Sequence, residues 1–396
     1  MATVESARRH PAERSSFIYD PRVRGIIVQV LVFLALALLV WWIVGNTIDN
    51  LRRANISSGF GFLQGRSGFD IAQTPIAYSS NSTYIRALTI GLLNTLIVAL
   101  AGIVTATIIG GLVGIGRLSR NWLIRKLCMV YVELFRNIPP LLVIFFWYFG
   151  VLAVLPLPRD SVDLPLGSYV NSRGLYIPRI IFEPGAWLIL AGLVVGLVLA
   201  FLTARWARQR QMATGQPFPV LLTGLALVIG LPLLGALAGG WPLSIELPEL
   251  GAFNLAGGFQ VKPEFLSLYL ALSFYTASFI AEIVRAGILG IPRGQSEAAF
   301  ALGLRPGPTQ RLVILPQAAR IIIPPLTSQY LNLTKNSSLA IAIGYPDLVA
   351  VGQTAMNQTG QAIEVVVIWM VVYLSISLAT SAFMNWFNAR VALVER

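Results

Sequence analysis

Two long apolar stretches without a charged residue constrain this chain more than any other feature. Residues 25–48 contain the pair Trp41 and Trp42 near their end, and residues 87–116 are rich in glycine and threonine. A helix of about 20 mostly apolar residues crosses the hydrocarbon core of a bilayer and makes all its backbone hydrogen bonds internally. A secretory signal peptide is the alternative for the first stretch, but the run is too long and no small-residue cleavage site follows it closely. The sequence therefore predicts an all-α protein that crosses a membrane.

The composition excludes several other classes of protein. Charged residues make up 12% of the chain, against about 25% in average soluble domains, which excludes an ordinary globular enzyme and a disordered regulator. The chain has one cysteine, Cys128, so it cannot form an intrachain disulfide. It has one histidine, His10, so neither a histidine-based triad nor a histidine zinc cluster is expected. The net charge of +12 comes from short basic clusters between apolar stretches, whereas a nucleic-acid binder has one basic patch. Neither a metal site nor a nucleic-acid partner is expected.

The same length criterion predicts eight transmembrane spans. Prolines interrupt the third and the seventh, so the count could differ by one at either place; in the third, Glu133 and Arg136 precede Pro139-Pro140. The predicted spans cover residues 25–48, 87–116, 128–156, 186–203, 220–237, 265–289, 321–343 and 363–387.

The basic residues orient these spans, because cytoplasmic loops carry an excess of Lys and Arg. If the N-terminus is cytoplasmic, the inner segments contain 19 Lys or Arg and the outer segments contain 8. Both ends of the chain are therefore predicted to be cytoplasmic.

The chain lacks the phosphate-binding loop of ATP-hydrolysing pumps, which ends in Gly-Lys-Ser or Gly-Lys-Thr. Its lysines are Lys126, Lys262 and Lys335, and none of them follows a glycine. The glycine-rich run 110–114 lies inside an apolar stretch, where close helix packing is the better interpretation.

The segment 289–316, between the sixth and seventh spans, is too patterned for a simple turn. Ser296 or Gln295 can cap a short helix over residues 297–302, and Gly303 can end it. The pattern predicts a first short helix beneath the membrane.

Prolines determine the rest of this segment. Pro306 and Pro308 prevent one continuous helix, and a second short helix is predicted over residues 309–315, before Pro316. The result is a compact helix–turn–helix. It is either an amphipathic connector without a partner or a docking surface for another protein.

Several motifs resemble those of a known transporter family. Glu297-Ala298-Ala299, Gly303 and Val313-x-Leu315-Pro316 are similar in spacing to the signature cytoplasmic loop of binding-protein-dependent ABC importer permeases. Further motifs are similar to the histidine/glutamate/glutamine/arginine/opine amino-acid permeases, although Asn137-Ile138 and Asn336-Ser337 replace more usual residues. These motifs occupy residues 133–140, 281–287, 315–318 and 334–339. The enlarged plan is similar to the longer permease subunits of general L-amino-acid importers.

The resemblance implies a core of five spans, namely the second, third, sixth, seventh and eighth. One extra span precedes this core and two are inserted into it. The implied divisions are a cytoplasmic segment 1–24, an extra span with a periplasmic segment 25–86, core parts 87–156 and 265–387, an insertion 157–264, and a cytoplasmic end 388–396.

The resemblance also implies the partners of the chain in a bacterial inner membrane. They are a second permease subunit, with a heterodimer favoured, a dimer of ATPase subunits and a periplasmic amino-acid-binding protein. No cofactor is expected on this chain, because ATP and Mg would be used by the ATPase. The chain would form half of the translocation pathway of an ATP-driven amino-acid importer.

The candidate site residues form two sets. The set expected to couple to the ATPase comprises Glu297, Ala298, Ala299, Gly303, Leu315 and Pro316. The set expected in the substrate pathway comprises Glu282, Arg136, Asn332, Thr334, Lys335 and Asn336. Glu282 and Arg285 are spaced i, i+3, so a structural ion pair is the alternative to a pathway role for Glu282. An unpaired buried ammonium is costly, so Lys335 is expected to have a partner.

Two other functions compete with this one. An ion-gradient-driven secondary transporter or channel would work without an ATPase, but Glu133 and Glu282 are the main carboxylates within the spans. An integral-membrane enzyme lacks a catalytic cluster. The modest set of intramembrane polar groups favours a broad range of L-amino acids over a single ligand.

Overall fold

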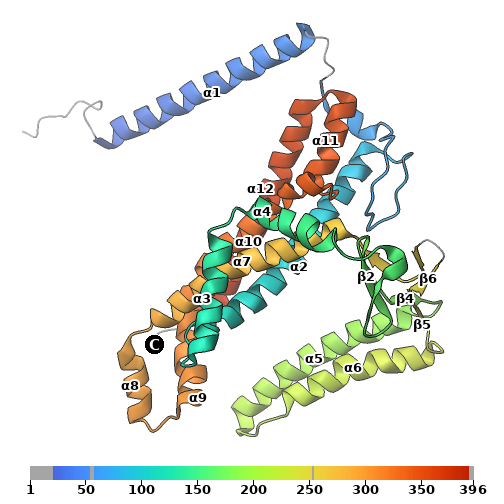
Figure 1. Cartoon of the computed structure of the whole chain (residues 1–396). Coiled ribbons are helices and arrows are strands. Elements are labelled where there is room, and N and C mark those ends of the chain that lie inside the picture. Colours follow the sequence, from blue (N-terminus) through green and yellow to red (C-terminus); the bar gives the residue numbers. More distant parts are fainter. Residues whose placement is uncertain (1–20, 54–57, 252–253, 392–396) are drawn as a thin grey trace, which may run out of the picture.

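The computed structural model describes residues 21–53, 58–251 and 254–391 (Figure 1). Most of the predicted cytoplasmic segment 1–24 and the last residues of the chain therefore lie outside the described residues. Within them, six helices are long and apolar enough to cross a membrane, or up to eight spans if each of two bent helix pairs counts as one. The prediction of a helical fold that crosses a membrane several times is confirmed for the spans. The long helices are α1 (Pro21–Arg53), α2 (Tyr84–Gly116), α5 (Trp187–Thr214), α6 (Val220–Ala238), α7 (Pro263–Leu289) and α12 (Ala362–Val391).

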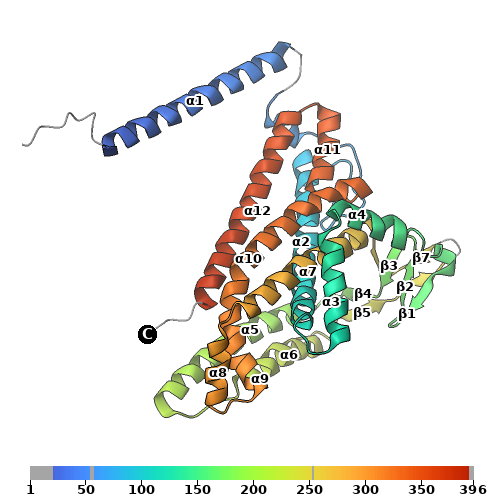
Figure 2. The ribbon, with the colours of Figure 1, turned by 60° about the vertical axis from the view of Figure 1, so that its left-hand side comes forward.

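The core is built around α2 and α7, which lie side by side in both views (Figures 1 and 2). A Cβ atom at Gly110 would lie 2.6 Å from the Cβ of Ile280, and one at Gly114 would lie 2.7 Å from the carbonyl oxygen of Ala281. Small residues allow two helix backbones to approach this closely in a membrane. The prediction that the glycine-rich run serves helix packing is confirmed. A Cβ atom at Gly111, by contrast, would have no atom of another segment within 4 Å.

We expect Gly110→Ala to destabilise the bundle, because the added methyl group must displace Ile280 or the backbone of Ala277. Overpacking of a tight interior costs about 1–3 kcal/mol. Gly111→Ala adds the same methyl group in open space and should be neutral or slightly stabilising, since alanine favours helix more than glycine. Thermal unfolding of the two purified variants measures the difference. Equal melting temperatures would contradict the close packing of α2 on α7.

The third predicted span is not one straight helix. The first part is α3 (Trp122–Arg136). The second part consists of α4 (Pro140–Phe145) and the π-helical turn η3 (Phe146–Leu152). The chain bends by 109° between the two parts. The side chain of Asn121 accepts hydrogen bonds from two backbone N–H groups of the first turn of α3, so this helix begins before the predicted span. Pro139-Pro140 cannot continue the hydrogen bonds of α3. The chain therefore turns at these prolines, where the sequence predicted an interruption of the third span.

The seventh predicted span also belongs to a bent pair. α10 (Leu315–Asn336) runs into the 3-10 helix η6 (Ser337–Ile343), and α11 (Leu348–Thr359) then departs at 52°. α11 lies in a part of the chain that was expected only to be an outer segment. Asp347 caps it by accepting a hydrogen bond from the backbone N–H of Ala350 at 2.8 Å.

The insertion contains short strands that the all-α prediction did not include. One antiparallel sheet has the order β1-β2-β3-β8, and β4 pairs with β5 and β6 with β7. β3 precedes the α5–α6 hairpin and β8 follows it, so the pairing of these two strands joins the start of the insertion to its end. α7 begins directly after β8. The strands are β1 (Val162–Leu164), β2 (Ser168–Asn171), β3 (Gly174–Ile177), β4 (Arg179–Phe182), β5 (Leu243–Glu246), β6 (Glu249–Leu250), β7 (Leu255–Ala256) and β8 (Phe259–Val261), with 3-10 turns η2 (Phe60–Gln64) and η4 (Pro158–Asp160).

The α5–α6 hairpin packs mainly on itself. A Cβ atom at Gly192 would lie 2.5 Å from the carbonyl oxygen of Leu231, and one at Gly196 would lie 2.6 Å from that of Leu227. Glycines on α5 thus let the two helices pack backbone to backbone. α1 lies apart from the other helices in both views, and its apolar stretch is exposed along its length (Figures 1 and 2).

Candidate functional site

The segment between α7 and α10 is a helix–turn–helix, as predicted, but its boundaries differ. α8 (Arg293–Ala301) begins before the predicted helix, with Pro292 at the N-cap position and no side-chain cap. The prediction of a cap by Ser296 or Gln295 is therefore wrong. Proline next to the first turn has a φ already suited to a helix and sacrifices no backbone hydrogen bond. The Oε1 of Gln295 instead accepts a hydrogen bond from Nε2 of Gln317 at 3.0 Å, which ties α8 to α10.

Gly303 ends α8, as predicted. Its φ is +76°, a left-handed conformation that glycine adopts without steric cost. The backbone N–H of Gly303 donates to the carbonyl of Phe300 at 2.9 Å, and the N–H of Leu304 donates to that of Ala299 at 3.1 Å. This pair of hydrogen bonds is the Schellman arrangement of helix ends, so the turn after α8 depends on this glycine.

Burial divides the residues of α8 into an inner and an outer set. Ala299 is only 3% exposed, whereas Glu297 and Ala298 are exposed. Phe300 and Leu302 are also exposed, by 51% and 82%, and sequence reasoning missed both. Large apolar side chains left bare beside a carboxylate are typical of a surface that another protein covers.

The second half of the segment differs from its prediction. α9 (Pro306–Thr309) starts earlier than expected, and a π-helical turn, η5 (Gln310–Ile314), leads directly into α10. The prediction that this helix stops before Pro316 is wrong. A proline ring clashes with a regular preceding turn, and the wider π turn ahead of Pro316 accommodates it. Leu315 and Pro316 are both exposed.

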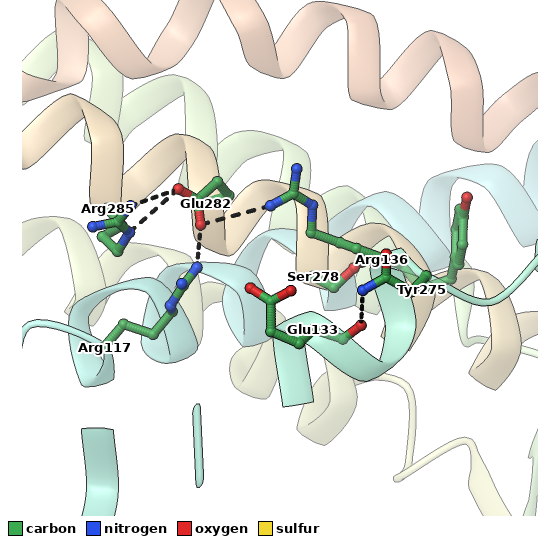
Figure 3. A network of polar contacts seen from close by, with 8 residues as sticks. Arg117, Glu133, Arg136, Tyr275, Ser278, Glu282 and Arg285 are labelled. Carbon is green, nitrogen blue, oxygen red and sulfur yellow. Dashed lines mark hydrogen bonds and ion pairs between the residues drawn. The ribbon is translucent and has the colours of Figure 1, made fainter. Parts of the chain in front are cut away.

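Glu282 on α7 holds an ionic cluster two turns from the end of that helix (Figure 3). The Nη2 of Arg285 lies 2.9 Å from Glu282 Oε1, so the predicted i, i+3 pair is present. Arg117, which follows the last residue of α2, forms an ion pair with Oε2 of the same carboxylate. The Nη1 of Arg136, at the end of α3, lies 3.8 Å from that oxygen. One carboxylate thus joins α2, α3 and α7.

The cluster has an excess of positive charge. One carboxylate faces three guanidinium groups, and the exposed fraction rises from 11% for the Arg117 side chain to 38% for that of Arg136. Arg136 also lies over the ring of Phe279 at 5.6 Å, a favourable cation–π geometry. A guanidinium has five N–H donors and stays protonated. Arg136 therefore retains donors for a further anion.

Four more pathway candidates lie on α10, and their burial differs. Asn332 and Lys335 are exposed, and Asn336 is half-buried. Thr334 is only 5% exposed, and its Oγ1 donates a hydrogen bond to the carbonyl of Tyr330 at 2.9 Å. Thr334 is therefore engaged within its own helix.

A polar stripe follows the exposed side of α10. Ser328, Asn332 and Lys335 are all exposed, and their spacing of i, i+4 and i+7 places them on one helix face. In the part of the chain that the structure describes, Lys335 forms no ion pair, so its expected partner is not a carboxylate among these residues. A charge within a span faces a bundle interior or a watery cavity rather than lipid.

Arg320 on α10 was also missed by sequence reasoning. Its Nε and Nη2 atoms are buried and have no hydrogen-bond acceptor among the described residues. The signal was available, because this arginine stands alone in the apolar run 318–323.

A buried polar network that the sequence did not indicate joins α2 to neighbouring segments at the end of the core away from the Glu282 cluster. The Nδ2 of Asn94 on α2 donates to the carbonyls of Gln73 and Pro346, at 3.0 and 2.9 Å. The hydroxyl of Tyr345 donates to the carbonyl of Asn94 at 3.1 Å. Asn94 and Tyr345 are fully buried. The network fixes the bend between η6 and α11 against α2.

Comparison with known proteins decides the family. Residues 259–393, from β8 to the end of α12, match a family model described as "Binding-protein-dependent transport system inner membrane component". The chain is 64% identical to the general L-amino acid transport system permease protein AapQ of Rhizobium johnstonii, over 96% of this chain and 95% of that protein. This chain belongs to the permease subunits of amino-acid ABC importers. It is also 42% identical to the glutamate/glutamine/aspartate/asparagine transport system permease protein BztB of Rhodobacter capsulatus, over 96% of this chain and 97% of that one.

This membership fixes the general role of the permease. It is a multi-pass membrane subunit of an amino-acid ABC importer, and it has no ATP-binding site of its own. An importer of this kind works with ATPase and binding-protein partners. Because both alignments cover nearly the whole chain, the insertion with α5 and α6 lies within the region that these relatives share.

Proposed function

We propose that the permease forms half of a translocation pathway for a broad range of L-amino acids. The observation that supports this proposal is the 64% identity with a general L-amino acid transport permease over nearly the whole chain. The few intramembrane polar groups agree with it, since they can contact the ammonium and carboxylate shared by all amino acids. Much of the selectivity would then rest with the periplasmic binding protein.

The stripe of Ser328, Asn332 and Lys335 supports a pathway along α10. An ammonium group cannot remain in hydrocarbon at low cost, and this face of α10 is uncovered in the single chain. The second permease and a water-filled path would cover it. Lys335 and Arg136 would then offer positive charge to the substrate carboxylate.

Glu282 has a different role in this proposal. Both of its carboxylate oxygens are occupied by guanidinium groups from α2, α3 and α7. They are therefore not free for a substrate ammonium. We assign Glu282 to the ionic tie between these helices.

The second permease would be a different chain. A two-fold symmetric homodimer brings the same surface from both copies together, and the exposed stripe of α10 carries Lys335 but no carboxylate. A different subunit can supply the missing negative charge. A heterodimer is thus the better electrostatic match.

The α8 segment would dock on the ATPase, which uses ATP and Mg. Exposed Glu297 and Ala298, together with the bare side chains of Phe300 and Leu302, give this surface a charged edge and an apolar centre. The pairing of Gln295 with Gln317 would pass motion of the docked helix to α10.

The orientation follows from charge. Basic residues are concentrated in the segments that include α8 and the α5–α6 turn, so these would face the cytoplasm of a bacterial inner membrane. Both chain ends would lie on that side. In a variant whose native Cys128 is replaced by serine, labelling of a cysteine introduced at Arg305 or at Arg173, from either side of the membrane, tests this orientation.

Competition and co-purification test the proposal. Uptake of one labelled neutral amino acid should be inhibited by neutral, acidic and basic L-amino acids alike, and a tagged permease should retain a second, different permease. Inhibition by a single amino acid would contradict the broad range. A fully active complex that contains tagged and untagged copies and no other permease would contradict the heterodimer.

A further inference from the structure

The α5–α6 hairpin has features that the transport function does not use. It packs mainly on itself and makes no extensive contact with the core. Its outward-facing side chains are mostly apolar and exposed, including Leu190, Val194 and Phe201 on α5 and Leu222 on α6. In a membrane, these surfaces meet lipid.

Aromatic side chains mark where the hairpin crosses the two membrane surfaces. Trp187 and Trp241, at the β-strand end, are 68% and 56% exposed. Trp206, near the turn of the hairpin, is 49% exposed and packs edge-on against Phe218 with ring centroids 5.4 Å apart. Trp187 and Trp206 are about 28 Å apart along the helix axis, close to the roughly 30 Å of hydrocarbon. Tryptophans gather at membrane–water interfaces, so Trp206 lies at headgroup level.

Three arginines lie beside Trp206, and the hairpin contains no acidic residue to balance them. They are Arg205, Arg208 and Arg210, and the chain contains no carboxylate between Glu183 and Glu246. Arg210 is engaged, because its Nη2 donates to Gln216 at 3.1 Å and its guanidinium lies 5.4 Å from the ring centroid of Trp206.

Arg205 and Arg208 remain available. Both are exposed and form no ion pair among the described residues. Their i, i+3 spacing puts them on one face of α5. Arg208 also lines a shallow surface depression with Gln209 and Met212, which gives this face both guanidinium donors and an apolar contact.

We propose that this end of the hairpin binds the headgroup of an anionic phospholipid. Arg205 and Arg208 hold the phosphate through guanidinium hydrogen bonds, a geometry that suits arginine better than lysine, and Met212 contacts the lipid beside it. The occupant is a lipid because the site lies at headgroup level on a hairpin that makes no extensive contact with any other element in the described part of the chain. The orientation given under the proposed function places this lipid in the cytoplasmic leaflet. The binding itself does not depend on that orientation.

Lipid binding by the purified transporter complex tests the proposal. Native mass spectrometry with added phosphatidylglycerol or phosphatidylcholine should show retention of phosphatidylglycerol. The double variant Arg205→Gln/Arg208→Gln should weaken it roughly 25-fold, since each basic residue near an anionic surface contributes about fivefold. Arg205→Lys/Arg208→Lys should keep part of the binding. The matched control Arg66→Gln/Arg173→Gln, which removes two exposed arginines elsewhere, should change nothing.

Several outcomes would overturn the proposal. Equal retention of phosphatidylglycerol by the wild type and the double glutamine variant would do so, as would equal retention of both lipids by the wild type. Displacement of the lipid by millimolar inorganic phosphate would indicate a site for the free ion. Loss of a protein subunit from the double variant would indicate a protein occupant. None of these measurements requires transport, so their failure is distinct from failure of the proposed function.

Discussion

Glu282→Gln is expected to reduce uptake by at least tenfold, and equally for neutral, acidic and basic amino acids. The substitution leaves three guanidinium groups of α2, α3 and α7 without their shared carboxylate. Breaking a fully buried ion pair costs about 3–5 kcal/mol, but this carboxylate side chain is 26% exposed and solvent screens part of the effect. A loss of about 2 kcal/mol corresponds to roughly 30-fold in the equilibrium constant between the correctly packed bundle and its mispacked forms. Uptake and thermal stability of the complex, measured together, test this expectation.

Glu133→Gln is the matched control. It makes the same chemical change on α3, where Glu133 is exposed and forms no ion pair among the described residues. It should keep nearly full uptake and stability. A Glu282→Gln complex that assembles normally but changes the relative rates of the three amino-acid classes would instead place Glu282 in the substrate pathway.

Gly303→Val is expected to abolish coupled transport while the permease still inserts and assembles. Valine at a φ of +76° is strained by about 1–2 kcal/mol or more, so the Schellman turn opens and α8 no longer presents its exposed face. Uptake should fall at least tenfold, and ATP hydrolysis by the complex should no longer respond to the binding protein. Parallel assays of ATPase activity and uptake in proteoliposomes measure both effects.

Two further variants separate docking from folding. Gly307→Val lies in the same segment at a glycine without positive φ and with open space around it, so it should leave coupling intact. Glu297→Arg reverses an exposed charge and should uncouple without lowering thermal stability. Normal uptake in both Gly303→Val and Glu297→Arg would refute a coupling role for α8.

The apolar spans were predictable from sequence because hydrocarbon imposes a simple rule of length and polarity on every helix that crosses it. The same rule misses elements that depend on local hydrogen bonding. α11 begins at the side-chain cap provided by Asp347, and the strands of the insertion are too short to stand out beside the spans. The bend after Arg136 is encoded by Pro139-Pro140, but the two prolines do not specify its angle of 109°.

The candidate site also contains features that follow from local sequence and features that depend on how distant segments pack. Gly303 was predictable, since few residues other than glycine end a helix in this way. The i, i+3 spacing likewise predicted the contact between Glu282 and Arg285. Arg117 was not predicted as a partner of Glu282, because the two are 165 residues apart and meet only when α2 packs on α7. The exposure of Phe300 and Leu302 could not be read from sequence either, since it depends on how α8 folds onto α9.

The most direct test is uptake of a labelled L-amino acid by proteoliposomes that contain the permease, a second permease and the ATPase. Uptake should require both ATP on the ATPase side and the binding protein on the opposite side. An ionophore that collapses ion gradients should leave it unchanged. Uptake by the permease without an ATPase, driven by a proton or sodium gradient, would contradict the assignment to an ATP-driven importer.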